Sequence, residues 1–172
     1  MRHTLAISVE NRFGELARIV GLFSARGYNI ETLTVAETLE DQVSRVTLVT
    51  NGDDRAVEQI VKQLDKQVRV LSVRNLTVVD HIEREMVLLH VNAEPGNARL
   101  EIMQLAEVFE AKVIDVSEDG LTIEAVGERY KVEALLRSLQ PFGIRELARA
   151  GTLAIGRLPA RTVVNEDEFA AS

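Results

Sequence analysis

Apolar residues recur at the spacing of an amphipathic helix in four separate segments of the chain. In each segment they stand at positions i, i+3, i+4 and i+7, which lie along one face of a helix. The four sets are Leu16/Ile19/Val20/Phe23, Val57/Ile60/Val61/Leu64, Ile102/Leu105/Ala106/Phe109 and Val132/Leu135/Leu136/Leu139. Each set predicts a helix that lies on one face of a sheet.

Stretches with the pattern of β-strands separate these helices. Leu5, Ile7 and Val9 alternate with smaller or polar residues, and Val68 and Val70 begin a similar alternation that runs toward Val78. Two further runs, residues 46–49 and 86–91, are apolar or β-branched and have the length of a strand. We therefore expect strands on both sides of each predicted helix.

Turn and cap residues stand at the borders of the predicted elements. Residues 11–14 (Asn-Arg-Phe-Gly) separate the first strand from the first helix, and Gly27 stands where a helix end favours a left-handed residue. Residues 51–54 (Asn-Gly-Asp-Asp) end a strand and supply an Asp cap for the second helix. The pair Asp119-Gly120 predicts a hairpin turn between two short strands.

The order of the elements predicts a fold of the α+β class. Residues 4–79 give strand, helix, strand, strand, helix, strand, and residues 84–156 repeat that order. This βαββαβ order is typical of ferredoxin-like domains, in which both helices cover one face of a four-stranded antiparallel sheet. The other face is left open and must pack against something.

The same pattern gives the domain boundaries that we expect. Residues 1–80 form the first ferredoxin-like domain and residues 84–157 the second, with a short polar linker at residues 80–84 (Asp-His-Ile-Glu-Arg) between them. Residues 158–172 carry three acidic side chains and no apolar periodicity, so we expect a disordered tail there.

Composition favours an oligomeric protein of the cytoplasm. The chain has 172 residues, of which 46% are hydrophobic and 4% aromatic, and two domains of about 80 residues bury small cores that need a neighbouring domain or subunit. A net charge of −7 without a basic stripe argues against nucleic-acid binding. Neither a transmembrane helix nor the apolar core of a signal peptide is found in the sequence, so no membrane partner is expected. The absence of cysteine excludes disulfides, thiolate metal sites and cysteine nucleophiles.

The residues that perform catalysis in other proteins form no recognisable set here. The sequence has no Walker or dinucleotide-binding glycine loop and no G-x-S-x-G motif. The histidines His3, His81 and His90 have no spacing typical of metal ligands, and Glu83 and Glu85 are interpreted as part of a solvated face. We therefore predict no catalytic residue, no metal site and no enzymatic activity for the chain alone.

The first loop, residues 11–14, is the best candidate for a binding site. The backbone N–H groups of a helix start are unpaired and carry partial positive charge, so they suit a carboxylate or a phosphate. Gly14 lets a ligand approach the backbone closely. Turn statistics alone favour a plain turn at Asn11 and Gly14, and that interpretation stays open at this point.

The same loop resembles a known family. Residues 5–16 resemble the opening of ACT domains, whose loop reads N-x-x-G-x-L. Residues 19–35 (IVGLFSARGYNIETLTV) are similar to the diagnostic stretch of acetolactate synthase small subunits, in which an ACT domain precedes a second ferredoxin-like domain. Further similar stretches are residues 44–47, 63–68, 113–116 and 146–151. The resemblance covers nearly all of residues 2–157.

The resemblance implies a regulatory subunit in branched-chain amino-acid biosynthesis. Members of this family form homodimers and bind a branched-chain amino acid, usually valine, between paired ACT domains. They activate a separate catalytic large subunit and inhibit it when valine is bound. The resemblance implies no cofactor in this chain, because thiamine diphosphate, Mg²⁺ and FAD belong to the catalytic subunit.

The resemblance also assigns six residues to the effector site. Asn11, Gly14, Glu15 and Leu16 come from the first loop and helix start, and Asn29 and Ile30 reach the same ligand from the partner subunit. Backbone N–H groups would hold the α-carboxylate, the Asn oxygens the ammonium, and Ile30 the aliphatic side chain.

This loop departs from the usual ACT pattern. Phe13 replaces a frequent Pro, and the charge of Glu15 competes with an incoming carboxylate unless its side chain points to solvent. Leucine or isoleucine would use the same backbone contacts as valine, with discrimination of roughly 1–3 kcal/mol per methylene.

Two other interpretations remain open from the sequence. A free-standing ACT sensor of another enzyme or of transcription would need a DNA-binding motif or a fused catalytic domain, and neither is visible. A small acyl-phosphate hydrolase of ferredoxin-like fold would need a catalytic Arg and Asn, for which Arg12 beside Asn11 is the candidate.

Overall fold

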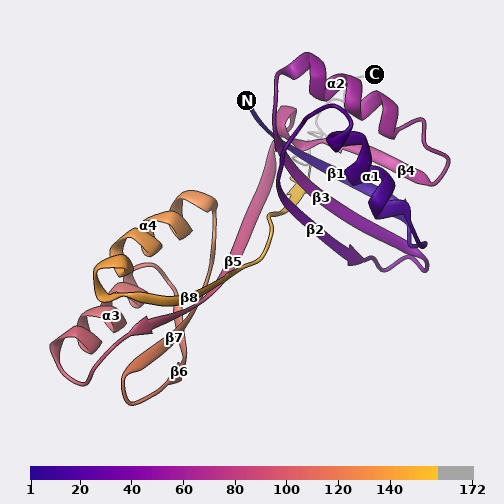
Figure 1. Cartoon of the computed structure of the whole chain (residues 1–172). Helices are drawn as coiled ribbons and strands as arrows, with labels where there is room; N and C mark the ends of the chain where they lie inside the picture. Colours follow the sequence, from indigo (N-terminus) through magenta and orange to yellow (C-terminus); the bar gives the residue numbers. More distant parts are fainter. Residues whose placement is uncertain (159–172) are drawn as a thin grey trace, which may run out of the picture.

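The computed structural model describes residues 1–158, so nearly all of the tail that the sequence sets apart lies outside the described residues. Two lobes are visible, each with two helices on one face of an antiparallel sheet (Figure 1). The elements of the first lobe are β1 (Arg2–Glu10), α1 (Glu15–Ser24), β2 (Ile30–Glu37), β3 (Val43–Asn51), α2 (Asp54–Leu64), β4 (Val70–Asn75) and η1 (Leu76–Val78). Those of the second are β5 (His81–Asn92), α3 (Asn97–Val108), β6 (Lys112–Val116), β7 (Gly120–Gly127), α4 (Arg129–Leu139), η2 (Gln140–Phe142), β8 (Ile144–Arg149) and β9 (Leu153–Gly156).

The first sheet has the strand order β2-β3-β1-β4, with all neighbours antiparallel. Its helix-covered face carries alternate residues of each strand, because successive side chains of a strand point to opposite faces. The core there consists of Leu5, Ile7, Val9, Val46 and Leu48 from the strands and Ile19, Phe23, Val57, Ile60 and Leu64 from the helices. The predicted helical stripes are therefore confirmed in α1 and α2, except that Leu16 is exposed. The last strand is shorter than predicted, because β4 runs from Val70 to Asn75 and residues 76–78 form the short helix η1.

The second sheet repeats this plan with the order β6-β7-β5-β8. Its core joins strand residues such as Val87, Leu89 and Ile123 to Ile102 of α3 and to Leu135 of α4. The predicted α+β fold with two βαββαβ units is therefore confirmed.

The predicted caps and turns are also present. Asp53 caps α2 by accepting a hydrogen bond from the Ala56 N–H at 2.8 Å. Gly27 has a φ of +71° after the end of α1, the left-handed conformation that a helix end favours. Asp119 and Gly120 lie in the turn between β6 and β7, closed by a hydrogen bond from Ser117 N–H to the Gly120 carbonyl.

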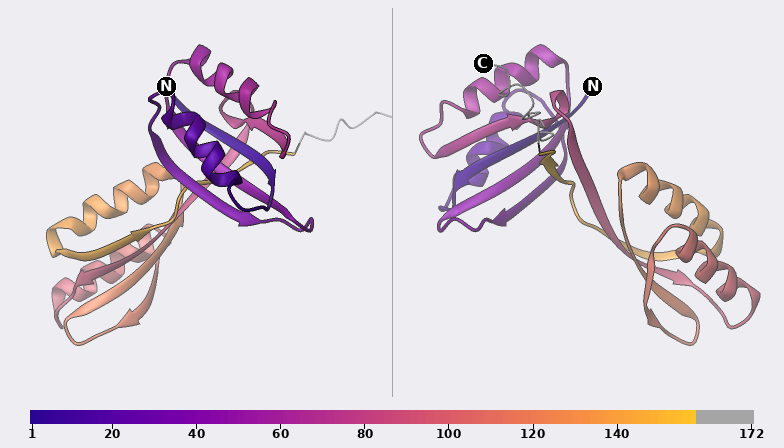
Figure 2. Two further views of the ribbon diagram at one scale, coloured as in Figure 1. Left: turned by 45° about the vertical axis from the view of Figure 1, so that its right-hand side comes forward. Right: turned by 180° about the vertical axis from the view of Figure 1, so that it is seen from behind.

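The segment expected to link the two domains, residues 80–84, is not a loop, because residues 81–84 are the beginning of β5. Residues 81–84 pair with β9, which brings the chain back toward the first lobe and adds a strand that the sequence pattern did not reveal. Figure 2 shows that β5 and the segment leading to β9 are the two chain segments that run between the lobes. We call this pair of strands, residues 81–84 and 153–156, the arm.

A polar side chain of the arm is held by the first sheet, which explains how so polar a segment can be a strand. Glu83 accepts hydrogen bonds from Arg2 at 2.8 Å and from the Thr4 hydroxyl. Burial raises the pKa of Glu83, but hydrogen bonds from Thr4, Arg2 and His81 outweigh burial and hold its pKa below the ordinary value. The ionised carboxylate of Glu83 is thus bound by residues of the first sheet, whereas the polar sequence around it predicts a solvated face.

The arm covers part of the open face of the first sheet. Ala6 of β1, Leu76 of η1 and Ala154 of β9 form a small buried cluster there. Arg45 donates to the Ala154 carbonyl at 3.0 Å, and the Thr152 N–H donates to the Thr32 hydroxyl at 3.3 Å. The face that the helices leave open is therefore occupied in part by the chain itself.

We predict that Gly151→Ala destabilises the attachment of the arm. A Cβ at this position would clash with the Thr34 hydroxyl and lie 3.1 Å from the Leu33 carbonyl. Overpacking of this kind costs about 1–3 kcal/mol of unfolding free energy, which equilibrium urea unfolding measures. The matched control is Gly156→Ala at the end of β9, where a Cβ would have no atom within 4 Å. Equal stability of the two variants would contradict the packing described here.

Candidate functional site

The loop at residues 11–14 ends in a helix start that no side chain caps. Gly14 is the N-cap of α1 and has a φ of +89°, a conformation that glycine adopts easily. The Gly14 carbonyl accepts a hydrogen bond from the Arg18 N–H at 3.1 Å. Glycine has no side chain, so it cannot cap the N–H groups of the first turn. The N–H groups of Leu16 and Ala17 form no hydrogen bond within the described residues. Exposed, unpaired donors of this kind suit an anion.

Glu15 does not point to solvent, the direction in which its charge would not compete with a carboxylate ligand. Its side chain is only 3% exposed and forms ion pairs with Arg69 at 3.0 Å and Arg18 at 3.2 Å. The competing charge is thus countered by two guanidinium groups. The negative charge of Glu15 is therefore largely compensated at the helix start.

Asn11 connects the loop by hydrogen bonds to the last residue of β2 and to the turn that follows it. Its side-chain N–H donates to the Glu37 carboxylate at 2.8 Å, and its backbone N–H donates to the Gln42 carbonyl at 2.6 Å. The side-chain oxygen of Asn11 accepts no hydrogen bond within the described residues, so it is available to a donor such as an ammonium group.

Asn29 and Ile30 lie at the opposite end of β2 from this loop. Ile30 is the first residue of β2, and Glu37, the partner of Asn11, is the last. Seven strand steps separate them, a distance of about 23 Å. One chain therefore brings Asn11, Gly14, Glu15 and Leu16 together but not Asn29 and Ile30.

Apolar side chains around the loop are unusually exposed. Phe13 and Leu39 are fully exposed, and Leu16 and Val35 are about two-fifths exposed. Val35 lies in β2, one of the two edge strands of the sheet, and Leu39 follows that strand. Phe13 and Leu16 lie in or beside the loop, which the Asn11–Glu37 hydrogen bond joins to the end of β2. An edge strand flanked by exposed apolar residues is a ready surface for pairing with another chain.

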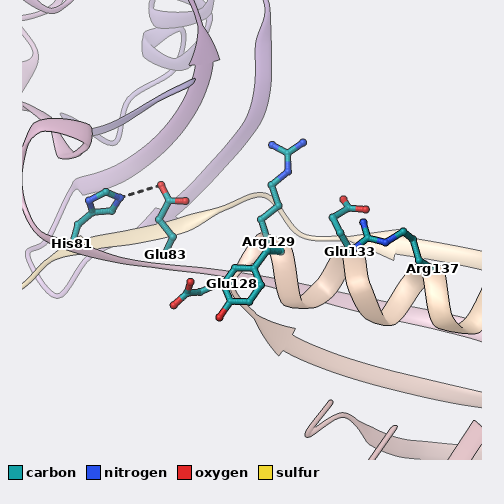
Figure 3. A pocket seen from close by; sticks show the side chains of 7 residues that line it. His81, Glu83, Glu128, Arg129, Glu133 and Arg137 are labelled. Carbon is teal, nitrogen blue, oxygen red and sulfur yellow. Dashed lines mark hydrogen bonds and ion pairs between the residues drawn. The ribbon is translucent and has the colours of Figure 1, made fainter. Parts of the chain in front are cut away.

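Two cavities formed by the described residues are lined by other residues than 11–14. One, of about 790 Å³, is on the open face of the first sheet, between Ser8, Glu37 and Ile155, and adjoins the loop only through Glu37, the partner of Asn11. Another, of about 590 Å³, lies between the lobes, where the first turns of α4 face His81 and Glu83 of β5 (Figure 3). A single chain thus offers the loop as a surface and not as an enclosed pocket.

Two partners of the loop were not predicted from the sequence. Arg69 reaches Glu15 across 54 residues, and Glu37 reaches Asn11 across 26. Neither stands in a local motif, so only the sheet order that places the start of β4 and the end of β2 beside this loop could have indicated them.

Among residues 1–158, no group of three or more His, Asp or Glu side chains has an arrangement that could hold a metal ion. None of the helices described is long and apolar enough to span a membrane.

The chain is similar to known proteins over both lobes. Residues 5–72 match the family described as the AHAS small subunit-like ACT domain, and residues 84–158 match the family described as the small subunit of acetolactate synthase. A probable acetolactate synthase small subunit of Archaeoglobus fulgidus is 46% identical, over 91% of this chain and 98% of that protein. The acetolactate synthase small subunit of Aquifex aeolicus is 45% identical, over 91% and 81%. The crystal structure of the acetolactate synthase small subunit of Thermotoga maritima has a TM-score of 0.84 at 37% identity, over 92% and 99%.

We predict that Arg69→Met destabilises the first lobe by about 1–3 kcal/mol, because it removes one of two cations from a buried carboxylate. The control is Arg12→Met, which removes a cation from the exposed pair with Glu10 and should change stability by less than about 1 kcal/mol. Adding Glu15→Gln to Arg69→Met should recover part of the loss in thermal unfolding. No difference between the two arginine variants would show that Glu15 does not need Arg69.

Proposed function

The chain belongs to the acetolactate synthase small subunits, and from this premise we propose that it binds a branched-chain amino acid, valine first, between the first lobes of two copies. The proposal further states that the bound amino acid lowers the activity of the catalytic large subunit. Without it, the chain raises that activity. The observation that carries the proposal is the uncapped start of α1 at Gly14, beside the free edge of β2.

In this proposal the α-carboxylate binds at the start of α1. The N–H groups of Leu16 and Ala17 are its donors, since no side chain competes for them. The positive end of the helix dipole adds favourable charge. The neutralised Glu15 leaves that end free to attract an anion.

The second half of the site comes from a partner copy. If two β2 strands associate antiparallel about a two-fold axis, the beginning of one strand lies beside the end of the other. Residues 29 and 30 of the partner then lie close to Glu37 and to Asn11. This arrangement would bring together residues that lie at opposite ends of β2 in one chain, and it would cover the exposed apolar residues Val35 and Leu39.

The remaining contacts would select an amino acid over a simple carboxylate. The Asn11 oxygen, with Asn29 of the other copy, would accept from the ammonium group, and Glu37 adds a negative charge nearby. Leu16 and Ile30 would line the pocket for a short aliphatic side chain. Because these walls discriminate by a methylene, valine, leucine and isoleucine would compete at the same site.

Regulation requires that binding changes the equilibrium between two states of the assembled enzyme. A coupling free energy of about 1–3 kcal/mol corresponds to a 5- to 150-fold effect, and it acts equally in both directions. The thiamine-diphosphate-dependent catalytic subunit would carry the chemistry together with its Mg²⁺ and FAD. A free-standing amino-acid sensor is the less favoured alternative, because both lobes match the small subunits.

Reconstitution tests this function directly. We expect that mixing the purified chain with an acetolactate synthase large subunit raises the rate of acetolactate formation and that valine then lowers it. The chain alone should show no turnover. A chain that changes neither the rate nor the valine sensitivity of the large subunit would contradict the proposal.

A substitution at Gly14 tests the carboxylate site. Gly14→Asp should abolish valine inhibition and leave activation in place, because it puts a negative charge where the α-carboxylate binds. Gly14→Asn is the matched control, since Asn has nearly the same size and also tolerates a positive φ. We expect Gly14→Asn to retain more valine affinity than Gly14→Asp in calorimetric titration. Full valine sensitivity in Gly14→Asp would overturn the site assignment.

A further inference from the structure

Glu31 stands at an irregular position directly after the residues proposed to contact the effector. The pairing of β2 with β3 shifts register between Ile30 and Thr32, which leaves Glu31 in a bulge. A bulge lacks one regular ladder position and turns a side chain in a new direction. The direction of the Glu31 side chain therefore depends on how residues 29 and 30 are held.

This bulged side chain contacts the second lobe. Arg129, the first residue of α4, donates to the Glu31 carboxylate at 3.0 Å, across 98 residues of sequence. Figure 3 shows the Arg129 side chain extending from the first turn of α4, away from the helix and into the space between the lobes. The Asn51 amide also donates to Glu31, so the carboxylate is held from both lobes.

The same carboxylate adjoins the polar contacts that attach the arm. Arg2 lies 3.7 Å from Glu31 and donates to Glu83 at 2.8 Å and to the Thr152 hydroxyl at 3.4 Å. The Thr152 hydroxyl in turn donates to the buried Glu85 at 3.1 Å. A continuous set of hydrogen bonds and ion pairs thus runs from the start of β2 to β5 and to the segment before β9, the two chain segments that run between the lobes.

We propose that Glu31 and Arg129 form a positioning pair that transmits effector binding at residues 29 and 30 to the second lobe. This inference rests on the proposed function. An amino acid and a partner copy that hold residues 29 and 30 also fix the bulge, and with it the direction of Glu31. A change at Glu31 alters its bond to Arg129 and so the orientation of α4 relative to the first sheet.

The size of the expected effect follows from the exposure of the pair. The side chain of Glu31 is 23% exposed and that of Arg129 is 45% exposed. Ion pairs in contact with water contribute modestly. Breaking this pair should therefore weaken transmission about two- to fivefold and should not abolish it.

The experiment compares valine binding with valine inhibition. The dissociation constant is measured by calorimetry on the free chain, and the inhibition midpoint is measured on the enzyme reconstituted with a large subunit. For Arg129→Gln we expect the ratio of midpoint to dissociation constant to rise about two- to fivefold, with activation retained. Glu31→Gln should raise the ratio as well, and the exchange Glu31→Arg with Arg129→Glu should return it toward the original value.

The matched control is Arg137→Gln on the same helix. Arg137 lines the same cavity in Figure 3, but it forms no ion pair with any residue in the described part of the chain. An unchanged ratio in Arg129→Gln, an equal rise in Arg137→Gln, or no recovery in the exchanged pair would each overturn the inference. If the unsubstituted chain binds no valine, the proposed function fails instead, which separates the two results. If Arg129→Gln does not fold, Glu31→Gln, which removes the other charge of the pair, carries the test.

Discussion

In each lobe, two helices cover only one face of a four-stranded sheet. The rest of this structure depends on what packs against the other face and on what pairs with the edge strand β2. The open face of the first sheet is partly covered by the arm, through Ala154 and the hydrogen bonds of Thr152 and Arg45. The edge at β2 is left without a strand partner within the described residues. The buried helical face makes the lobe stable, the arm joins it to the second lobe, and the edge is available to another copy.

The free edge and the uncapped helix lie side by side, and each is incomplete alone. The start of α1 offers donors and partial positive charge, while Arg69 and Arg18 counter the negative charge of Glu15. The residues proposed to complete the pocket lie at the far end of β2. In the proposed dimer, a site divided in this way would couple ligand binding to subunit pairing, so that each would strengthen the other. Glu31, beside Ile30, extends this coupling to the second lobe.

The sequence predicted the features that are determined by residues close together in the chain, namely the helices, the caps and the turns. The helical stripes ending in Phe23 and Leu64, the Asp53 cap and the left-handed Gly27 all follow from spacing or backbone preference. The prediction failed where contacts are distant in sequence. The polar segment around Glu83 is a strand because Arg2 and Thr4 satisfy its carboxylate, and Glu15 is buried because Arg69 reaches it. The six effector residues remain a prediction, since one chain cannot bring them together.

Mixed dimers provide the most direct test of a site shared between two copies. Gly14→Asp damages the loop and Asn29→Ala damages the strand start, so each homodimer should bind no valine. In a dimer of the two variants, one site carries both defects and the other carries neither. After subunit exchange, calorimetry should therefore detect valine binding at about a quarter of the original number of sites. If mass spectrometry shows mixed dimers and no valine binding returns, the site is not shared between copies.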